Sequence, residues 1–305
     1  MTGSAWTQAT LTAASTRPIS SHAEENWSPA RSVWTCGNRA PQRRRETPLP
    51  QATPLESAVV SSAAAEVTRR LPRGWGHLIL QFVIWMGFYV VYQLVRGAAD
   101  RNLASAYRHG EWVVLEEKRF GALFEPAVQH VTDTSSILIT LTSYTYWLSQ
   151  FAVVGLTLAW VYFRHHERFT GFRNWLIVAN LIGLVGYVLV PTAPPRMFPE
   201  WGFIDTLGQY SSLNHDSGLI ALAANPYAAM PSLHAMDAFI VGVVMASICR
   251  SRIAKALWFA WPVWVAFAVV STGNHYWLDV VAGVLVAIAT GIALRRISSL
   301  RLRRA

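Results

Sequence analysis

Long apolar segments separated by shorter polar connections dominate the chain from residue 71 onward. A helix that crosses the hydrocarbon core of a membrane needs about 20 predominantly apolar residues. Six segments meet or approach this length, at roughly 76–96, 143–163, 174–192, 234–249, 255–272 and 277–295. We therefore expect an all-α fold in which residues 71–299 form a bundle of six transmembrane helices, followed by a short basic tail over residues 300–305.

The connection between the first two segments, residues 97–140, has a pattern of its own. Apolar residues recur with helical spacing at positions 103, 107, 112, 115, 120 and 123, with charged and polar residues between them. This pattern favours an interfacial helix that lies along the membrane surface between helices one and two. A lid that only packs against the bundle is the alternative, and the sequence leaves both open.

Residues 1–70 differ in composition from the rest of the chain. They are rich in Ala, Ser, Thr, Pro and Arg, show no sustained helical or strand period, and contain three consecutive arginines at 43–45. Such a composition buries too little apolar surface to offset the entropy of an unfolded chain. We expect a disordered basic leader here, and no apolar core of a secretory signal follows its first charges.

The overall composition supports a membrane protein. Only 14% of the 305 residues are charged, whereas soluble globular domains average about 25%. The two cysteines, Cys36 and Cys249, lie in the leader and at the end of an apolar segment, so neither a disulfide framework nor a cysteine-based metal site is expected. The net charge of +9 alone would suit nucleic acid, but in a membrane protein the placement of the charges matters more, and we expect no nucleic-acid partner.

Basic residues alternate between the connections in a way that predicts orientation. Residues up to Arg73 carry nine of the 26 basic residues, whereas the long connection at about 193–233 carries only Arg196. Lysine and arginine concentrate in cytoplasmic connections. The other basic connections are 164–173, with Arg164, Arg168 and Arg173; 250–255, with Arg250, Arg252 and Lys255; and the C-terminal end. We therefore expect a cell-membrane protein with both termini on the cytoplasmic side and connections 193–233 and 271–275 on the opposite side.

Ionisable residues inside apolar segments mark the candidate chemistry, because they are costly in a membrane and are functional candidates by default. Only two of the 17 acidic residues are embedded, Asp237 and Asp279. Each lies within one helical turn of a histidine, His234 or His275, and the four-residue spacing of His275 and Asp279 predicts that they share one face of a helix. The predicted orientation places both pairs, together with Arg196, at the same outer boundary. We therefore expect an active site on the extracytoplasmic face.

These residue types suit phosphoryl transfer. An imidazole held by a carboxylate is fixed in one tautomer and becomes more basic, so His275 with Asp279 suits a nucleophile or base. His234 can protonate a leaving oxygen, and an arginine can contact two phosphate oxygens through its guanidinium fork. Acyl transfer would instead require a serine nucleophile and an oxyanion hole.

Two sequence motifs resemble those of a known family. Residues 231–234 (Pro-Ser-Leu-His) and 275–283 (His-Tyr-Trp-Leu-Asp-Val-Val-Ala-Gly) resemble the second and third motifs of the type 2 phosphatidic acid phosphatase superfamily. They are most similar to the inositol phosphorylceramide synthase-like, or inositolphosphotransferase, branch, as is the proline-rich stretch 191–195. The similarity covers about residues 75–295. It implies a six-helix core, a phosphohistidine on His275, Asp279 as its orienting group, His234 as general acid and no required metal or other cofactor.

The chain also departs from the pattern of the phosphatase branch. Leu233 stands in a position where that branch has glycine, and Val269 stands where it has arginine, six residues before the nucleophile. Its lysine-containing first motif is not evident. Arg196 is the candidate for the missing phosphate contact, with Arg101 and Arg108 of the interfacial helix as further candidates. Asn274 stands where the synthase branch often has another histidine.

The leading hypothesis is an integral membrane enzyme that acts on lipid phosphates, as a phosphatase if water is the acceptor or as a head-group phosphotransferase if an alcohol is. Membrane lipids are then its partners, and the sequence leaves the oligomeric state open. Three alternatives also stay open. They are an intramembrane serine hydrolase using Ser232 with His275, a non-catalytic lipid or proton-coupled transporter, and a metal site built from His234, His275 and Asp279.

Overall fold

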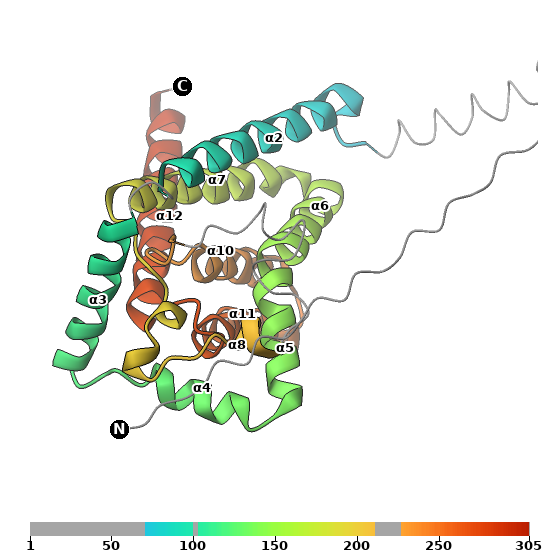
Figure 1. Ribbon diagram of the computed structural model, residues 1–305. Helices are drawn as coiled ribbons and strands as arrows, with labels where there is room; N and C mark the ends of the chain where they lie inside the picture. Colours follow the sequence, from blue (N-terminus) through green and yellow to red (C-terminus); the bar gives the residue numbers. More distant parts are fainter. Residues whose placement is uncertain (1–70, 100–102, 211–226, 305) are drawn as a thin grey trace, which may run out of the picture. The chain divides into compact units, whose positions relative to one another are not determined.

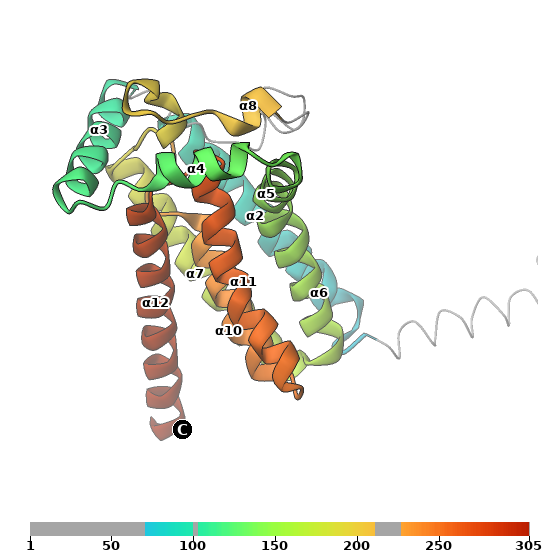
Figure 2. The ribbon, with the colours of Figure 1, turned by 90° about the horizontal axis from the view of Figure 1, so that it is seen from below.

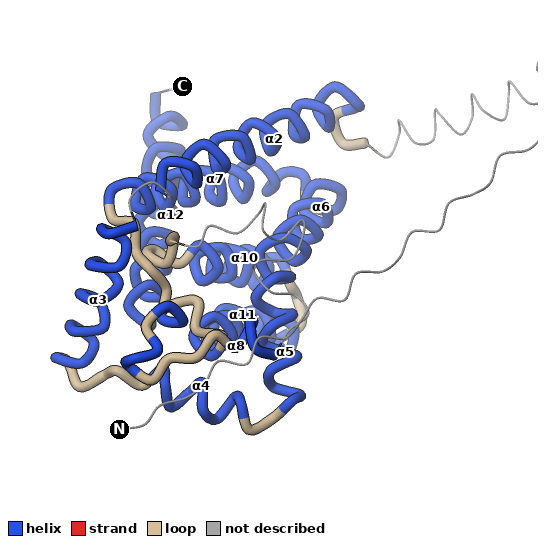
Figure 3. The backbone as a smooth tube through the Cα atoms, in the orientation of Figure 1, coloured by secondary structure: helices blue, strands red, loops and turns tan. Residues whose placement is uncertain are grey.

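The computed structural model describes residues 71–99, 103–210 and 227–304, all of them within one compact unit. The predicted leader, residues 1–70, lies outside this described part. Apart from a single isolated bridge between Thr192 and Ala228, the regular secondary structure of the described residues is helical (Figures 1 and 3). The prediction of an all-α fold is confirmed.

Each of the six predicted apolar segments contains a helix. Their bounds are α2 (Gly74–Ala99), α5 (Ser136–Leu148) continuing into α6 (Val154–Arg164), α7 (His166–Leu189), α10 (Leu233–Ile248), α11 (Arg252–Ser271) and α12 (Trp277–Arg304). Five are long and apolar enough to cross a membrane, with α5 and α6 counted as one continuous helix, whereas α10 has only 16 residues. The chain is therefore an integral membrane protein.

The second apolar segment begins earlier than its hydropathy indicates. The prediction placed its start near residue 143, but α5 begins at Ser136, where the Ser135 side chain accepts a hydrogen bond from the Leu138 backbone nitrogen at 3.4 Å. This N-cap satisfies a backbone donor that the helix itself leaves free. A short π-helix, η1 (Ser149–Val153), then joins α5 to α6.

The connection after α2 contains two described helices, where the sequence predicted one. They are α3 (Leu103–Arg119) and α4 (Glu125–Asp133), and Figure 2 shows both at the same end of the bundle as α8 (Thr206–Tyr210). The apolar stripe predicted on α3 is largely exposed, with Leu103, Tyr107, Trp112, Leu115 and Phe120 all among the exposed side chains. A different face is buried, formed by Ala106, Gly110, Val113, Val114 and Glu117.

Helix α10 is the central element of the bundle. Ten of its 16 residues are buried, and Figure 1 shows it enclosed by α5–α6, α7, α11 and α12. Its side chains Met236, Ile240 and Val241 are fully enclosed in the main hydrophobic cluster. The surrounding helices instead expose large apolar side chains such as Leu189 and Ile253, as expected where lipid replaces water as the solvent.

Candidate active site

Backbone hydrogen bonds join the three segments that carry the predicted site residues. The proline-rich stretch 191–197 bonds to residues 227–229, just before α10, and also to the loop between α11 and α12. The first turn of α12 bonds in turn to the start of α10. The bonds run from Thr192 N to Tyr227 O, Ala229 N to Thr192 O, Arg196 N to Gly273 O and Ser232 N to Asp279 O, at 2.9 to 3.1 Å. This network brings the three segments together at one end of the bundle.

Two glycines permit this close approach. Gly273 adopts φ +70°, and a Cβ atom there would lie 2.7 Å from the Gln129 side-chain nitrogen. A left-handed conformation favours glycine on steric grounds. A Cβ atom at Gly283 would overlap the backbone oxygen of Ser232. Gly273 therefore lets the turn before α12 pack against Gln129 and Arg196, and Gly283 lets α12 pack directly against Ser232.

His234 lies in the first turn of α10. Ser232 caps this helix, and its Oγ accepts a hydrogen bond from Ala235 N at 3.3 Å. The His234 ring stacks on Tyr146 of α5, with 4.4 Å between ring centroids and an interplanar angle of 21°. Packing against the tyrosine ring fixes the plane of this imidazole.

His275 contacts His234 edge-on, with 5.7 Å between ring centroids. It lies two residues before α12, so it does not share the helix with Asp279 as expected. Its Nδ1 lies 2.9 Å from the Ala229 carbonyl oxygen and 3.4 Å from Asp279 Oδ2. Since a carbonyl oxygen can only accept, Nδ1 is the donor. In the neutral ring, Nε2 therefore holds the free electron pair.

Asp279 also makes a second hydrogen bond, which explains why its carboxyl group lies farther from His275 Nδ1 than the Ala229 carbonyl oxygen does. Its Oδ2 also accepts a hydrogen bond from Tyr276 N at 3.0 Å, so the carboxyl group caps the start of α12. The Ala229 carbonyl, a backbone group, is consequently the closer partner of the His275 ring.

Burial lowers the pKa of His275 to about 3, and the positive charge of Arg196 acts in the same direction. His275 is therefore neutral at physiological pH.

Arg196 approaches the same place from a short 3₁₀ turn, η2 (Pro195–Met197). Its guanidinium donates a hydrogen bond to Asn274 Oδ1, and Asn274 Nδ2 donates to Thr272 Oγ1 at 2.9 Å. Asn274 is buried, whereas Arg196 remains partly exposed. Asn274 thus holds the guanidinium next to His275.

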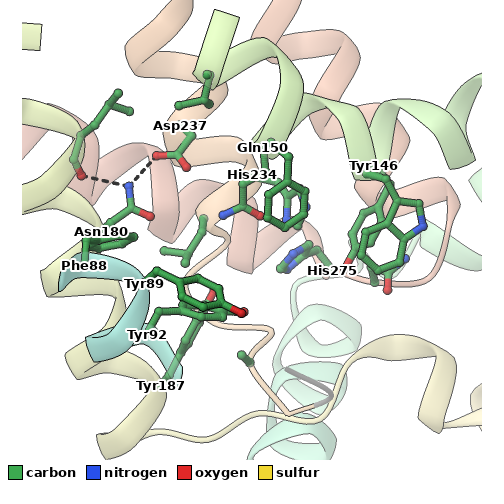
Figure 4. A pocket seen from close by; sticks show the side chains of 18 of the residues that line it. Phe88, Tyr89, Tyr92, Tyr146, Gln150, Asn180, Tyr187, His234, Asp237 and His275 are labelled. Carbon is green, nitrogen blue, oxygen red and sulfur yellow. Dashed lines mark hydrogen bonds between the residues drawn. The ribbon is translucent and has the colours of Figure 1, made fainter. Parts of the chain in front are cut away.

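A cavity of about 410 Å³ lies between these segments. His234, His275, Arg196 and Asn274 line one part of it, and Figure 4 shows the two imidazoles directed toward each other within it. The remaining wall is mainly aromatic, with Trp85, Phe88, Tyr89 and Tyr92 from α2 and Tyr146 and Trp147 from α5. A polar end next to an apolar aromatic wall suits a ligand that is itself amphipathic.

The other two predicted phosphate contacts are not part of this arrangement. Arg101 lies outside the described residues. Arg108 is exposed on α3, where its guanidinium donates to Ser105 Oγ at 2.8 Å, and it does not line the cavity.

Two buried carboxyl groups support the site from outside the cavity, and the sequence analysis missed both. Glu117 of α3 and Glu125 of α4 are fully buried. Their Oε1 atoms accept hydrogen bonds from two consecutive backbone nitrogens in the first turn of α12, Leu278 N at 3.2 Å and Trp277 N at 3.0 Å respectively. Burial, together with the facing Glu125, raises the pKa of Glu117.

One signal in the sequence indicates this arrangement. Glu117 continues the series Ala106, Gly110 and Val113, whose spacing of three and four residues places all of them on one face of α3. The face that contacts the bundle is thus marked by small residues as much as by large apolar ones.

The chain is similar in sequence to known proteins. Residues 111–293 match the PAP2 superfamily, and because this is more than half of the chain, the protein belongs to that superfamily. The chain is also 29% identical over 167 residues to a Bacteroides thetaiotaomicron protein named phosphoinositol dihydroceramide synthase. That match covers 48% of this chain and 51% of the relative, so it spans about half of the relative's length. No solved structure matches the chain. The resemblance predicted from the motifs is confirmed.

Proposed function

We propose that the protein is a membrane enzyme that breaks a phosphoester bond of a lipid substrate through a phosphohistidine formed on His275. The observation that carries this proposal is the convergence of His234, His275 and Arg196, from three separate segments, on one cavity with an aromatic wall. Membership of the PAP2 superfamily and the likeness to a lipid synthase support a substrate that is a lipid phosphate or a phospholipid.

In the first step, Nε2 of His275 forms a bond to phosphorus while the bond from phosphorus to the leaving alcohol breaks. His234 gives its proton to that alcohol oxygen. The attack leaves positive charge on the His275 ring, which the Ala229 carbonyl and Asp279 stabilise through Nδ1. Arg196, held by Asn274, contacts the phosphate oxygens and offsets their negative charge.

In the second step, an acceptor oxygen attacks phosphorus, transfers its proton to His234 and releases His275. If water is the acceptor, the reaction is hydrolysis. If a lipid alcohol is the acceptor, the reaction is head-group transfer. The name of the relative, a synthase, supports transfer, whereas the superfamily as a whole accommodates hydrolysis, so the experiment below decides the acceptor.

We further propose the predicted topology for this enzyme. Helix α10 crosses the membrane together with the five longer helices, although it is shorter than they are. The exposed apolar stripe of α3 lies at the membrane surface, and both termini are cytoplasmic. The residues around His275 lie at the same end of the bundle as α3 and α4 (Figure 2), which is then the extracytoplasmic end. The domain boundaries remain residues 1–70, 71–299 and 300–305.

The structure supports this mechanism over a serine nucleophile. Ser232 is fully buried, its Oγ is the helix cap of α10, and it is not among the cavity-lining residues. The metal alternative also finds no support in geometry, since within the described part of the chain no three His, Cys, Asp or Glu side chains are arranged to hold an ion.

The test compares the purified wild-type protein with His275→Ala and, as a matched control, His130→Ala. His130 is exposed on α4, at the same end of the bundle. Each protein is incubated with phosphatidic acid or phosphatidylinositol, with and without ceramide and with and without a chelator. Lipid mass spectrometry and phosphate release identify the products, and rapid quenching with ³²P-labelled substrate detects acid-labile phosphate on the protein.

We expect His275→Ala to lose activity by roughly 1,000-fold or more and to trap no phosphate on the protein, with the control and the chelated enzyme active. Phosphate release without ceramide identifies a phosphatase, and a new head-grouped lipid formed only with ceramide identifies a transferase. Equal turnover by His275→Ala and wild type would refute the mechanism. Lipid movement across liposomes without any turnover would instead establish a transporter.

A further inference from the structure

A second group of polar side chains lines the same cavity as the two histidines. Asp237 of α10, Asn180 of α7 and Gln150 of η1 come from three different elements and all face this space (Figure 4). Asp237 and Asn180 are 5% and 6% exposed, respectively. Neither the proposed mechanism nor the similarity of the motifs gives these three side chains a role.

The contacts among them are direct. Asn180 Nδ2 donates to Asp237 Oδ1 at 2.6 Å and to the Leu176 carbonyl oxygen at 2.9 Å. Both hydrogens of the Asn180 amide are therefore used, and what this side chain offers to a ligand is its acceptor oxygen. Gln150 faces the same carboxyl group and supplies both an amide donor and an acceptor.

A structural tie between two helices does not require this chemistry. A carboxyl group in a membrane-embedded segment is expensive, and such groups face a bundle interior or a water-filled cavity. Two neutral amides would join α7 and α10 at lower cost. Gln150 in addition lies within a π-helical turn, a feature that is frequent at functional sites.

Helix α10 fixes the position of Asp237 relative to His234. Asp237 follows His234 by three residues on this helix, which places it about 4.5 Å further along the helix axis. A substituent of a phosphate held by His234, His275 and Arg196 is therefore within reach of Asp237 in the same cavity. The distance corresponds to a few covalent bonds beyond the phosphoester.

We propose that Asp237, Asn180 and Gln150 form a hydrogen-bonding subsite for a hydroxyl-bearing substituent of the phosphate. A hydroxyl group both donates and accepts, which matches a carboxyl oxygen and two amides. Two substrates carry such a group at this distance: a polyol head group on the donor lipid, or the hydroxyl and amide region of a sphingoid acceptor. The subsite deepens the proposed function and rests on it for the position of the phosphate.

The experiment measures binding apart from turnover. Asp237→Asn and Asn180→Leu are each made in the wild type and in the inactive His275→Ala background. Thr290→Val is the matched control, because Thr290 is a buried polar residue of α12 that bonds only to its own helix. Binding is measured as the ligand concentration that half-maximally raises the unfolding temperature of the His275→Ala protein, and KM is measured with the active protein.

Two ligand pairs separate the sources of the hydroxyl group. Phosphatidylinositol is compared with phosphatidic acid of the same acyl chains, and ceramide with 3-deoxyceramide. We expect each subsite variant to lower the binding affinity for the hydroxyl-bearing ligand of one pair by about 10-fold. The affinity for the other ligand of that pair should stay within about 2-fold, since a buried polar site discriminates through the hydrogen bonds that it makes. The pair that responds identifies the donor or the acceptor.

Unchanged discrimination within both pairs, in variants that unfold at the control temperature, would overturn the subsite. An equal loss of binding affinity for both ligands of each pair would also overturn it, since that result indicates a purely structural tie between α7 and α10. Failure of the phosphohistidine mechanism has a different signature, namely turnover in His275→Ala, and leaves the binding comparison intact.

Discussion

Replacing Glu117 with glutamine tests how α3 and α4 hold the helix that follows the proposed nucleophile. Glu117 and Glu125 are fully buried and bind two consecutive backbone nitrogens of α12. Burial and the neighbouring carboxyl group raise the pKa of Glu117 well above its ordinary value of 4.5. The folded protein therefore keeps a proton on Glu117 at neutral pH that the unfolded chain has lost.

The sign of the pH dependence follows from this difference. Between the unfolded and folded pKa values the native state binds one proton more than the unfolded state, so the free energy of unfolding falls as pH rises. The fall is up to about 1.4 kcal/mol per pH unit, or about 3 kcal/mol between pH 5.5 and pH 7.5. This corresponds to roughly 6 to 12 °C in the unfolding midpoint of a domain of this size.

Glutamine reproduces the protonated form. Its amide oxygen still accepts from Leu278 N, and its NH₂ group donates to Glu125, but it does not ionise. We expect Glu117→Gln to unfold at a higher temperature than the wild type, by a difference that widens as pH rises from 5.5 to 7.5. Thermal unfolding of the detergent-solubilised protein at several pH values measures this difference.

Glu116→Gln is the matched control, because Glu116 is a partly exposed neighbour that pairs only with Arg119 at 3.8 Å. Such a surface pair contributes about 0 to 1 kcal/mol, so we expect a pH profile parallel to that of the wild type. A wild-type unfolding midpoint that stays level or rises between pH 5.5 and pH 7.5 would refute the proposal that Glu117 keeps its proton in the folded protein. So would a Glu117→Gln profile parallel to that of the wild type.

Two further substitutions test the geometry of the site. Asn274→Ala removes the group that holds the Arg196 guanidinium, so we expect KM for a lipid phosphate to rise by about 10-fold; steady-state kinetics with an unchanged KM would contradict this role. Gly283→Ala forces a Cβ atom against the Ser232 backbone oxygen, and we expect a loss of about 1 to 3 kcal/mol in thermal unfolding. Gly171→Ala, where a Cβ meets open space, serves as its control and should unfold near the wild-type temperature.

The sequence pattern predicted the membrane helices well, because the hydropathy of a segment depends only on its own residues. Every apolar segment is helical because an embedded backbone must satisfy its hydrogen bonds within its own segment. The start of α5 was missed because Ser136, Thr140 and Thr142 reduce the apolar character of its first turns, although Thr140 and Thr142 bond to backbone carbonyls within the helix. A hydroxyl group that finds its partner in its own helix does not interrupt it.

The two histidines stood out for a related reason. An ionisable residue in an otherwise apolar segment is conspicuous, so His234, Asp237, His275 and Asp279 could be singled out from the sequence. Their mutual arrangement could not. The expectation that His275 and Asp279 share a helix face was wrong in detail, because the Asp279 carboxyl group caps the helix and thereby ends it before His275.

Local chemistry along the chain therefore determined an all-α integral membrane protein and the residue types of its candidate site. Only the tertiary structure decided which partner fixes the His275 ring, since the Ala229 carbonyl is a backbone group with no signature in the sequence. It also decided that Tyr146 stacks on His234 and that Asn180 and Gln150 join Asp237 in one cavity. These contacts link residues far apart along the chain, and they form only when the helices around α10 pack together.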